Sequence, residues 1–210
     1  MGSIIKQLEN FRVVPVVTID DAKDALSLGK ALIKGGLPII EVTFRTAAGA
    51  EAIARLRYEL PDICAGAGTV LTIDQVNLSI DAGARFIVAP GFNPRVVDYC
   101  IDRNVPVFPG VNSPSQVEMG LERDLKVLKF FPAEASGGLK MLKAMAAPYG
   151  DVRFMPTGGI NIDNLKDYLA FDRIVACGGT WLATTALIND NRFYEITRLV
   201  KEVVKTTRQI

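Results

Sequence analysis

Short apolar runs recur along this chain at nearly regular intervals, and this repeat constrains the fold more than any other feature of the sequence. The runs are rich in Val, Ile and Phe and begin 19 to 26 residues apart, and most of the gaps carry the apolar spacing of an amphipathic helix. The eight runs are Val13–Thr18, Ile39–Phe44, Ile63–Ala67, Phe86–Ala89, Val105–Phe108, Val127–Phe131, Arg153–Pro156 and Arg173–Cys177. Alternating strands and helices predict a parallel sheet with right-handed connections.

Eight strand–helix units without a break in composition predict an α/β fold and, more specifically, a (β/α)8 TIM barrel that forms a single domain over residues 1–210. A doubly wound open sheet is the structural alternative, because periodicity does not establish that the sheet closes. Glycine and proline residues follow most of the predicted strands, on the face where such barrels carry their chemistry. Two amphipathic helices are expected at the ends, Ser3–Phe11 and Phe193–Val204, and the first of them is expected to cap the opposite end of the barrel.

The composition excludes several classes of site. The 210 residues include no histidine, which excludes His-based triads and His-ligated metals and removes the commonest general acid or base. The three cysteines form no C-x-x-C pair, which argues against a disulfide framework and a zinc site. A net charge of +1 gives no broad basic surface for nucleic acid or anionic lipid, and the longest uncharged stretch, residues 174–189, is too short to cross a membrane. We therefore expect a cytoplasmic protein without metal, nucleic acid or membrane partners.

Lys129 lies in the middle of a predicted strand, in the run Val-Leu-Lys-Phe-Phe-Pro. The two-residue period of a strand puts Val127, Lys129 and Phe131 on one face, so the amine has apolar neighbours. Removal from water favours the neutral amine, which is the form that attacks a carbonyl carbon. Two interpretations stay open: Lys129 is a nucleophile, or it is paired with a buried carboxylate for structural reasons only.

A carboxylate and a guanidinium share one face of the second predicted strand. The run Ile-Ile-Glu-Val-Thr-Phe-Arg puts Glu41 and Arg45 on the same side, and a carboxylate in mid-strand is costly unless it is paired or functional. Glu41 is a candidate proton carrier, and Arg45 is a candidate ligand for a substrate carboxylate through its planar guanidinium. Thr69, at the end of the third strand, is a candidate donor to the same anion. The alternative is a structural ion pair of Glu41 with Lys129 or Arg45.

Pairs of glycines end the seventh and eighth predicted strands, in Pro-Thr-Gly-Gly-Ile-Asn (156–161) and Cys-Gly-Gly-Thr (177–180). Glycines let backbone N–H groups approach an anion, and a helix that follows adds the positive end of its dipole. Units seven and eight carry the common phosphate site of this barrel. The two pairs therefore predict a phosphate site, with ordinary tight turns as the alternative.

Five motifs in this order resemble those of the bacterial 2-keto-3-deoxy-6-phosphogluconate (KDPG) aldolases, also called 4-hydroxy-2-oxoglutarate (KHG) aldolases. The motifs are Glu41-Val-Thr-Phe-Arg45, Gly66-Ala-Gly-Thr-Val70, Lys129-Phe-Phe-Pro-Ala-Glu134, Pro156-Thr-Gly-Gly-Ile160 and Gly178-Gly-Thr-Trp181. The resemblance implies a class I aldolase on a (β/α)8 barrel that uses neither metal nor cofactor. It implies cleavage of KDPG, a phosphorylated keto-deoxy sugar acid, into pyruvate and glyceraldehyde 3-phosphate, and assembly as a homotrimer.

The resemblance also implies roles for individual residues. Lys129 matches the lysine that forms the Schiff base, and Glu41 matches the acid and base residue. Arg45 and Thr69 match the contacts to the pyruvate carboxylate.

Other positions match the rest of the substrate pocket. Pro90 and Phe131 match its apolar walls. The remaining predicted substrate contacts are Thr157 and, at the phosphate end, Gly158, Gly159, Gly179 and Thr180. Two departures are visible: Asn112-Ser113-Pro114 stands where a Ser/Thr-rich segment is usual, and Thr180 stands where Ser is common. They leave the preference for a phosphorylated end open.

Two further hypotheses remain. The same residues are suited to the cleavage of KHG or of the galactonate-derived epimer of KDPG. Alternatively, the barrel binds a phosphate ligand without turnover, and Lys129 and Glu41 only neutralise each other.

Overall fold

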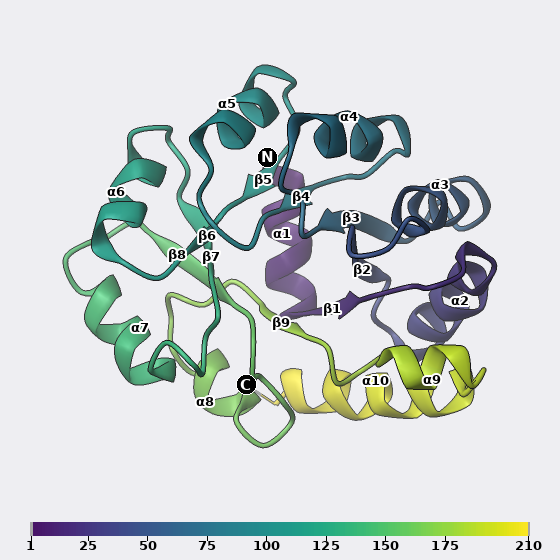
Figure 1. The fold of residues 1–210 in the computed structure, drawn as a ribbon. Helices are drawn as coiled ribbons and strands as arrows, with labels where there is room; N and C mark the ends of the chain where they lie inside the picture. Colours follow the sequence, from purple (N-terminus) through teal and green to yellow (C-terminus); the bar gives the residue numbers. More distant parts are fainter. Residues whose placement is uncertain (1, 210) are drawn as a thin grey trace.

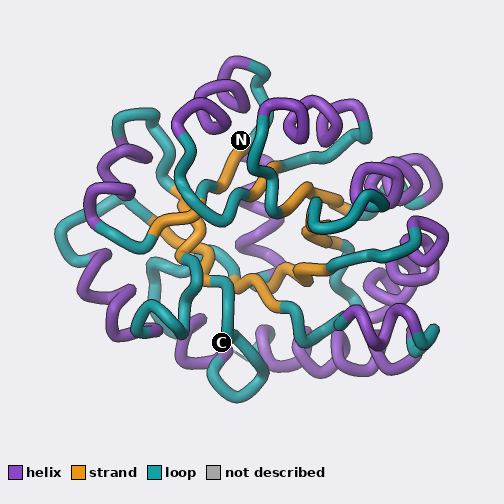
Figure 2. The backbone as a smooth tube through the Cα atoms, in the orientation of Figure 1, coloured by secondary structure: helices purple, strands orange, loops and turns teal. Residues whose placement is uncertain are grey.

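The chain forms an α/β fold in which short parallel strands lie at the centre and helices lie around them (Figure 1). The computed structural model describes residues 2–209, so Met1 and Ile210, the two ends of the predicted domain, lie outside the described residues. The backbone tube makes the separation clear, because the strands gather inside the outer helices (Figure 2).

The elements alternate along the chain as the apolar repeat predicts. The strands within residues 2–209 are β1 (Val13–Val17), β2 (Ile39–Thr43), β3 (Cys64–Gly68), β4 (Ile87–Val88), β5 (Val107–Phe108), β6 (Gly110–Val111), β7 (Val127–Phe130), β8 (Arg153–Pro156) and β9 (Cys177–Gly179). The helices there are α1 (Gly2–Phe11), the 3-10 helix η1 (Ala22–Asp24), α2 (Ala25–Gly35), α3 (Gly49–Glu59), α4 (Ile73–Asp81), α5 (Pro94–Asp102), α6 (Pro114–Leu121), α7 (Gly138–Ala146), α8 (Leu165–Leu169), α9 (Thr185–Asn189) and α10 (Phe193–Thr207). None of these helices is both long and apolar enough to cross a lipid bilayer.

Strand order explains how the sheet curls. Six strands pair in the order β5-β4-β3-β2-β1-β9 and three in the order β6-β7-β8, and every pairing is parallel. The order follows the chain except that the last strand returns to the first, with Val13 opposite Cys177. The result is a curled parallel sheet whose outer side is covered by helices (Figure 1).

Residues on both faces of the central strands are buried. Every residue of β1, β2 and β3 is buried, as expected for parallel strands that lie under helices on one side and face an interior on the other. Both predicted terminal helices form. Helix α1 buries Ile4 and Leu8, and α10 buries Ile196, Val200 and Val203 along one stripe.

The eighth predicted strand is displaced. The strand expected at Arg173–Cys177 begins only at Cys177, and Ile174 makes an isolated parallel bridge to Phe154. The segment first pairs with β8, where Val175 N donates to Phe154 O (3.0 Å), and then changes partner to the start of β1, where Cys177 N donates to Arg12 O (2.8 Å). A change of partner of this kind leaves no trace in apolar periodicity.

Strand β6 was not expected. Pro109 has no N–H to donate, and it separates β5, which pairs with β4, from β6, which pairs with β7. Its carbonyl is still used, because Lys129 N donates to Pro109 O at 2.9 Å.

All three cysteines are unpaired and buried. Burial raises the pKa of the Cys64 thiol to about 11 and that of Cys100 to about 12, and it raises the pKa of Cys177 as well. The cause is that a thiolate loses its hydration in apolar surroundings. The three thiols are therefore inert at neutral pH.

We predict slow reaction of the native protein with a thiol-specific disulfide reagent at pH 8, and complete reaction of all three cysteines in denaturant. The ordinary thiol pKa of 9.0 lies below the folded values. As the pH rises, the thiols of the unfolded chain therefore ionise before those of the folded protein. The contribution of the buried thiols to the free energy of unfolding is complete below pH 9 and is lost as the pH rises toward 12. Labelling kinetics and urea unfolding at increasing pH measure both effects. Fast labelling of the native protein would contradict the burial.

Candidate active site

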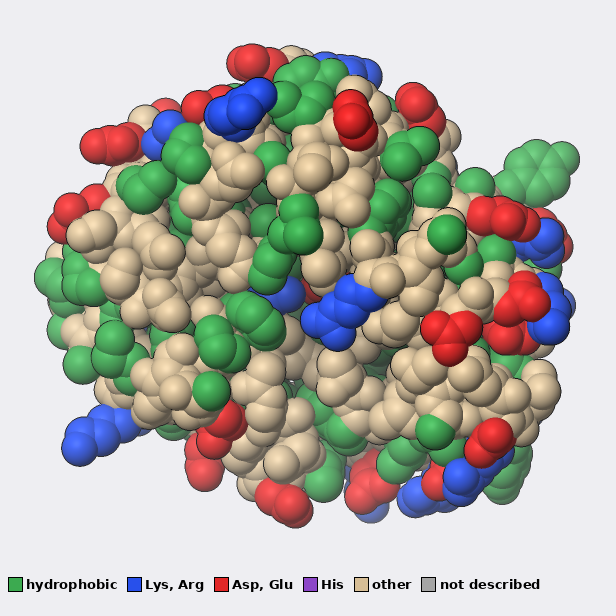
Figure 3. Space-filling model, in the orientation of Figure 1, with side chains coloured by type: hydrophobic (Ala, Val, Ile, Leu, Met, Phe, Trp, Pro, Cys, Tyr) green, Lys and Arg blue, Asp and Glu red, His purple; other side chains and the backbone are tan. Residues whose placement is uncertain are grey.

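A cavity of about 180 Å³ lies where strands from both parts of the curled sheet end. Its lining comes from residues at or just beyond the carboxyl ends of several strands. The lining residues are Val16, Arg45, Thr69, Pro90, Lys129, Phe131, Thr157, Gly158, Gly159, Ile160, Gly178 and Thr180. Figure 3 shows a hollow at the centre of one face with Lys or Arg side chains in it. Nine of the predicted site residues therefore share one cavity.

Lys129 and Glu41 meet inside the curled sheet, although 88 positions separate them in the chain. Lys129 Nζ lies 3.4 Å from Glu41 Oε1, and the two side chains are 6% and 0% exposed. The ring centroid of Phe131 lies 5.2 Å from the same Nζ. Two charges out of water need each other, because each alone would be strongly unfavourable. Of the two ion pairs that the sequence left open for Glu41, the structure contains the one with Lys129.

Strand register brings this pair together. Lys129 on β7 lies opposite Gly110 of β6 and Met155 of β8, and Glu41 on β2 lies opposite Val16 of β1. Because side chains alternate along a strand, these registers send the amine and the carboxylate into the same interior. A shift of one residue in either strand would turn its charge outward.

Gly68 on β3 provides the space that Glu41 occupies. A Cβ at position 68 would lie 2.2 Å from Glu41 Oε1 and 2.6 Å from Glu41 Cγ. Real Cβ atoms essentially never approach a neighbour so closely. The glycine is therefore required by the carboxylate rather than by its own backbone angles.

Two buried polar atoms at this site have no hydrogen-bond partner among residues 2–209. They are Glu41 Oε2 and Thr157 Oγ1. Buried polar groups are nearly always paired, so two unpaired ones near one cavity indicate positions where a ligand or water completes the hydrogen bonding. Thr157 lines the cavity directly, and a Cβ at Gly178 would lie 2.2 Å from its Oγ1.

Arg45 and Thr69 form the side of the cavity that is suited to an anion. Arg45 follows β2, is exposed, and makes no ion pair within the part of the chain that the structure describes. Thr69 has φ +57°, a left-handed conformation that a β-branched residue rarely adopts. Hydrogen bonds on either side hold it, from Phe44 N to Gly68 O (2.7 Å) and from Val70 N to Val88 O (3.2 Å). Strain of this kind is typical of functional sites.

The first glycine pair forms a loop whose carbonyl groups are all engaged by the protein. Gly158 and Gly159 have φ +100° and +84°. Ala133 N donates to Thr157 O (2.8 Å), Glu134 N donates to Gly158 O (3.0 Å), and the Asn164 side chain donates to Gly159 O (3.0 Å). These partially negative oxygens therefore face the protein and do not oppose an anion in the cavity.

One expectation about the glycine pairs is wrong, and the assignment of Gly179 to the substrate site stays a prediction. No helix follows them directly, because α8 begins at Leu165 and α9 at Thr185, so the N-terminus of neither helix lies next to its glycine pair. Gly179 does not line the cavity: a Cβ there would meet the Trp181 ring, whereas its neighbour Gly178 does line it. Adjacent residues of a strand face opposite sides, so Gly178 and Gly179 of β9 face opposite sides of the sheet.

Three lining residues were missed by the sequence analysis. Gly178 and Ile160 were quoted in motifs without a role, and Val16 was not singled out. Only the register of β1 beside Glu41 would have indicated Val16.

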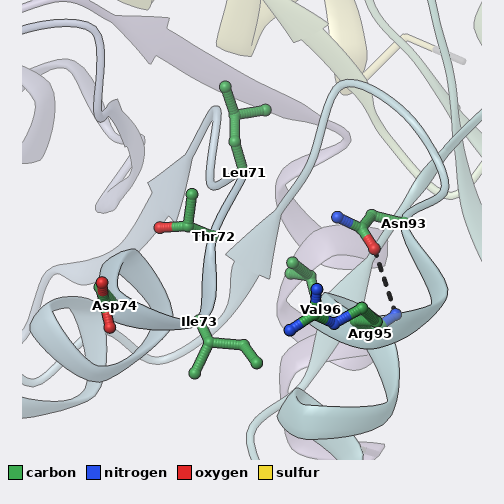
Figure 4. A pocket seen from close by; sticks show the side chains of 7 residues that line it. All are labelled: Leu71, Thr72, Ile73, Asp74, Asn93, Arg95 and Val96. Carbon is green, nitrogen blue, oxygen red and sulfur yellow. Dashed lines mark hydrogen bonds between the residues drawn. The ribbon is translucent and has the colours of Figure 1, made fainter.

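A larger hollow of about 520 Å³ lies elsewhere, between the start of α4 and the start of α5 (Figure 4). Two of its polar side chains are already engaged: Thr72 accepts from Gln75 N (3.2 Å), and Asn93 accepts from Arg95 N (3.1 Å). It is lined by Leu71, Thr72, Ile73, Asp74, Asn93, Arg95 and Val96. The lining of this larger hollow contains no buried amine beside a carboxylate. The smaller cavity is therefore the candidate active site.

Comparison with known proteins gives the family. The family model for KDPG and KHG aldolase matches residues 4–199. The chain belongs to this aldolase family. It is 50% identical over 201 residues to the 2-dehydro-3-deoxy-phosphogluconate aldolase of Haemophilus influenzae. The aligned region covers 96% of this chain and 95% of that protein. The resemblance drawn from the five motifs is confirmed.

Solved structures of aldolases have the same fold. The KDPG aldolase of Legionella pneumophila, with pyruvate captured as a covalent carbinolamine, matches with a TM-score of 0.89 and 38% identity over 91% of this chain and 93% of that one. The KDPG aldolase of Zymomonas mobilis with 3-phosphoglycerate matches with a TM-score of 0.89 and 37% identity over 95% and 94%. The curled sheet is therefore the aldolase fold.

We predict that Gly68→Ala destabilises this aldolase-family chain by about 1–3 kcal/mol, because the new methyl group overlaps the Glu41 carboxylate. Gly91→Ala is the matched control, since a Cβ at position 91 meets nothing within 4 Å. Urea unfolding of the two variants measures the difference. Equal stabilities would show that Glu41 does not occupy this position.

Proposed function

We propose that the chain is a class I aldolase that cleaves KDPG into pyruvate and glyceraldehyde 3-phosphate through a Schiff base on Lys129. The observation that carries the proposal is the buried Lys129 amine, 3.4 Å from the Glu41 carboxylate, in a cavity that is also lined by the guanidinium-bearing Arg45. Relatives named as aldolases of this substrate, 50% identical over nearly the whole chain, support it.

The reaction follows from these groups. Lys129 gives a proton to Glu41, and the neutral amine attacks the C2 ketone to give a carbinolamine. Glu41 returns the proton to the carbinolamine hydroxyl, which leaves as water, and a protonated imine that accepts electrons remains. Glu41 takes the proton of the C4 hydroxyl, through a water, as the C3–C4 bond breaks and glyceraldehyde 3-phosphate leaves. The pyruvate enamine is then protonated, and water hydrolyses the imine to release pyruvate and the amine. The carbinolamine in the Legionella relative is the first adduct of this sequence.

Arg45 and Thr69 bind the carboxylate of the substrate in this scheme. A guanidinium binds a carboxylate through two parallel hydrogen bonds, and Arg45 has no competing ion pair within residues 2–209. Pro90 and Phe131 form the apolar walls, which keep water from the imine.

The phosphate end is assigned to the loops after β8 and β9. Gly158, Gly159 and Thr180 line the cavity there, and the hydroxyl of Thr157 is free for a substrate hydroxyl. A Cβ at Gly179 would meet the Trp181 ring. Gly179 is therefore proposed to contact the phosphate end only through its backbone. The Zymomonas relative holds 3-phosphoglycerate, a phosphorylated three-carbon acid.

KHG is a second candidate substrate, because the matching family includes KHG aldolases. It carries the same 2-keto-4-hydroxy acid unit on which Lys129 and Glu41 would act, but no phosphate. Its cleavage would give pyruvate and glyoxylate. Steady-state kinetics with KDPG, its galactonate-derived epimer and KHG rank the three substrates.

We infer that the curled sheet closes as one (β/α)8 barrel domain. Parallel bridges from Phe154 to Ile174 and from Thr157 to Gly178 connect β8 to β9 and the segment before it. Only Pro109 separates β5 from β6. Both gaps between the two sheets are thereby narrow, and this supports closure.

We infer further that α1 caps the amino-terminal end of this barrel. Glu9 on α1 forms an ion pair with Arg153, the first residue of β8. Arg12, just after α1, donates to Leu169 O at 2.7 Å. Both contacts lie at the end opposite to the cavity, since Thr157 follows β8 at its other end.

Assembly as a homotrimer and a cytoplasmic location stay proposals. The homotrimer rests on family resemblance alone, and a measurement of the molecular mass in solution tests it. The second is supported by three unpaired cysteines, as expected in a reducing compartment.

We predict that sodium borohydride with pyruvate adds a pyruvate-derived mass to the peptide that contains Lys129, because reduction fixes the imine. Lys129→Ala abolishes both this adduct and KDPG cleavage, whereas Lys140→Ala, which removes an exposed lysine, changes neither. Peptide mass spectrometry and a coupled cleavage assay supply the measurements. An unmodified Lys129 would remove the aldolase assignment.

We predict that Glu41→Gln still forms the imine but slows turnover by about 10²- to 10⁴-fold, the usual contribution of a general acid or base. Glu59→Gln, at an exposed position, serves as the control. Borohydride trapping and kcat are measured on the same preparations. Full activity of Glu41→Gln would show that its assigned role is wrong.

A further inference from the structure

A second contact between a carboxylate and a side-chain donor lies beside the cavity, and the reaction scheme does not use it. The hydroxyl of Tyr168 on α8 donates to Glu134 Oε1. Glu134 follows β7, the strand that carries Lys129, and ends the third motif. Tyr168 is 2% exposed, whereas Glu134 is exposed, so this hydrogen bond is partly buried.

Glu134 is in direct contact with the glycine loop. Its N–H donates to Gly158 O at 3.0 Å. A Cβ at Gly159 would lie 2.6 Å from both Cβ and Cγ of Glu134, so the glutamate side chain lies against the bare Cα of Gly159. On its other side a Cβ at Gly138 would lie 3.0 Å from Glu134 Oε1 and 3.4 Å from the Tyr168 hydroxyl. The glutamate is thus held between two glycines.

Tyr168 connects the same loop to α8. Tyr168 N donates to Asn164 O at 3.3 Å, and the Asn164 side chain donates to Gly159 O at 3.0 Å. Desolvation, followed by the bond to Glu134, raises the pKa of the Tyr168 hydroxyl. The hydroxyl therefore stays protonated and remains a donor across the working pH range.

Gly158 and Gly159 have φ values that other residues rarely adopt, and glycine has more backbone freedom to lose than any other residue. A loop of this kind presents its N–H groups to an anion in a fixed arrangement only when its neighbours hold it. Glu134 and Asn164 contact the loop directly, and Tyr168 is hydrogen-bonded to both of them.

We propose that Glu134 and Tyr168 are positioning residues that fix the Gly158–Gly159 loop for the phosphate end of the substrate. The inference rests on the proposed function for the identity of that substrate. It does not extend to the imine chemistry at Lys129, which Glu134 and Tyr168 leave untouched.

Tyr168→Phe tests the proposal, because it removes one hydroxyl and keeps the buried ring. We expect KM for KDPG to rise about tenfold while kcat changes less than about twofold. The rate of pyruvate trapping at Lys129 should stay within about twofold, because pyruvate has no phosphate. Glu134→Ala should raise KM similarly, and Glu134→Gln, which keeps an acceptor oxygen, should raise it less.

Tyr99→Phe is the matched control. The Tyr99 hydroxyl donates to Asn77 Oδ1 at 2.8 Å, between the outer helices α5 and α4. Its loss removes a comparable hydrogen bond away from the cavity. A purely structural role for Tyr168 would lower the melting temperature of both variants without a selective rise in KM for KDPG.

Inorganic phosphate provides a second measurement that does not depend on turnover. Calorimetric titration should give a dissociation constant about tenfold higher for Tyr168→Phe than for Tyr99→Phe or the unchanged protein. An unchanged KM and phosphate affinity, or equal losses in KDPG affinity and pyruvate trapping, would overturn the proposal. So would the absence of phosphate binding by the unchanged protein.

Failure of the proposed function looks different. The unchanged protein would then neither trap pyruvate nor cleave KDPG, and the phosphate titration alone would decide whether Glu134 and Tyr168 position the loop.

Discussion

The buried ion pair between Lys129 and Glu41 is the contact on which the rest of the structure depends. A buried lysine and a buried glutamate are tolerated only if their charges are paired. The two side chains can form this pair only if β2 and β7 both direct their odd-numbered residues into the same interior. The pair therefore constrains the register of strands that are far apart in the chain. The neighbouring strands β1, β2 and β3 are buried on both faces, and this burial keeps most water from the pair.

Small residues around this pair serve mainly to leave space. Gly68 makes room for the Glu41 carboxylate, Gly178 for the Thr157 hydroxyl, and Gly66 for the Phe86 ring, which a Cβ would approach to 2.3 Å. None of these three has a positive φ, so their backbone would accept alanine and only the close approach forbids it. Gly158 and Gly159 are different, because their φ values are positive. The site thus uses glycine for close approach inside the sheet and for conformation in the loop.

The sequence predicted the parts of the site that depend on local periodicity. Lys129 and Glu41 were found because a charged residue in an apolar strand is conspicuous, and Arg45 because it shares a face with Glu41. Gly178 was missed because the inward face of β9 depends on where the chain changes partner from Phe154 to Arg12. Gly179 was included only through the family resemblance. The 3.4 Å contact itself joins residues 88 positions apart, and no short-range pattern carries that information. Helix starts at Leu165 and Thr185 were equally hidden, because turns precede them.

The size of the cavity divides the substrate between an enclosed part and an extended part. A cavity of about 180 Å³ is smaller than the usual ligand pocket of roughly 300–1,000 Å³, so it suits the keto acid portion for which we propose a reaction with Lys129. The rest of a phosphorylated sugar acid must then extend along the loop after β8 toward the mouth. With a net charge of only +1, the protein has no general positive field to hold the phosphate there. Its binding depends on how well the local backbone donors are arranged, and in this chain that arrangement depends on the contacts of Glu134 and Tyr168 behind the loop.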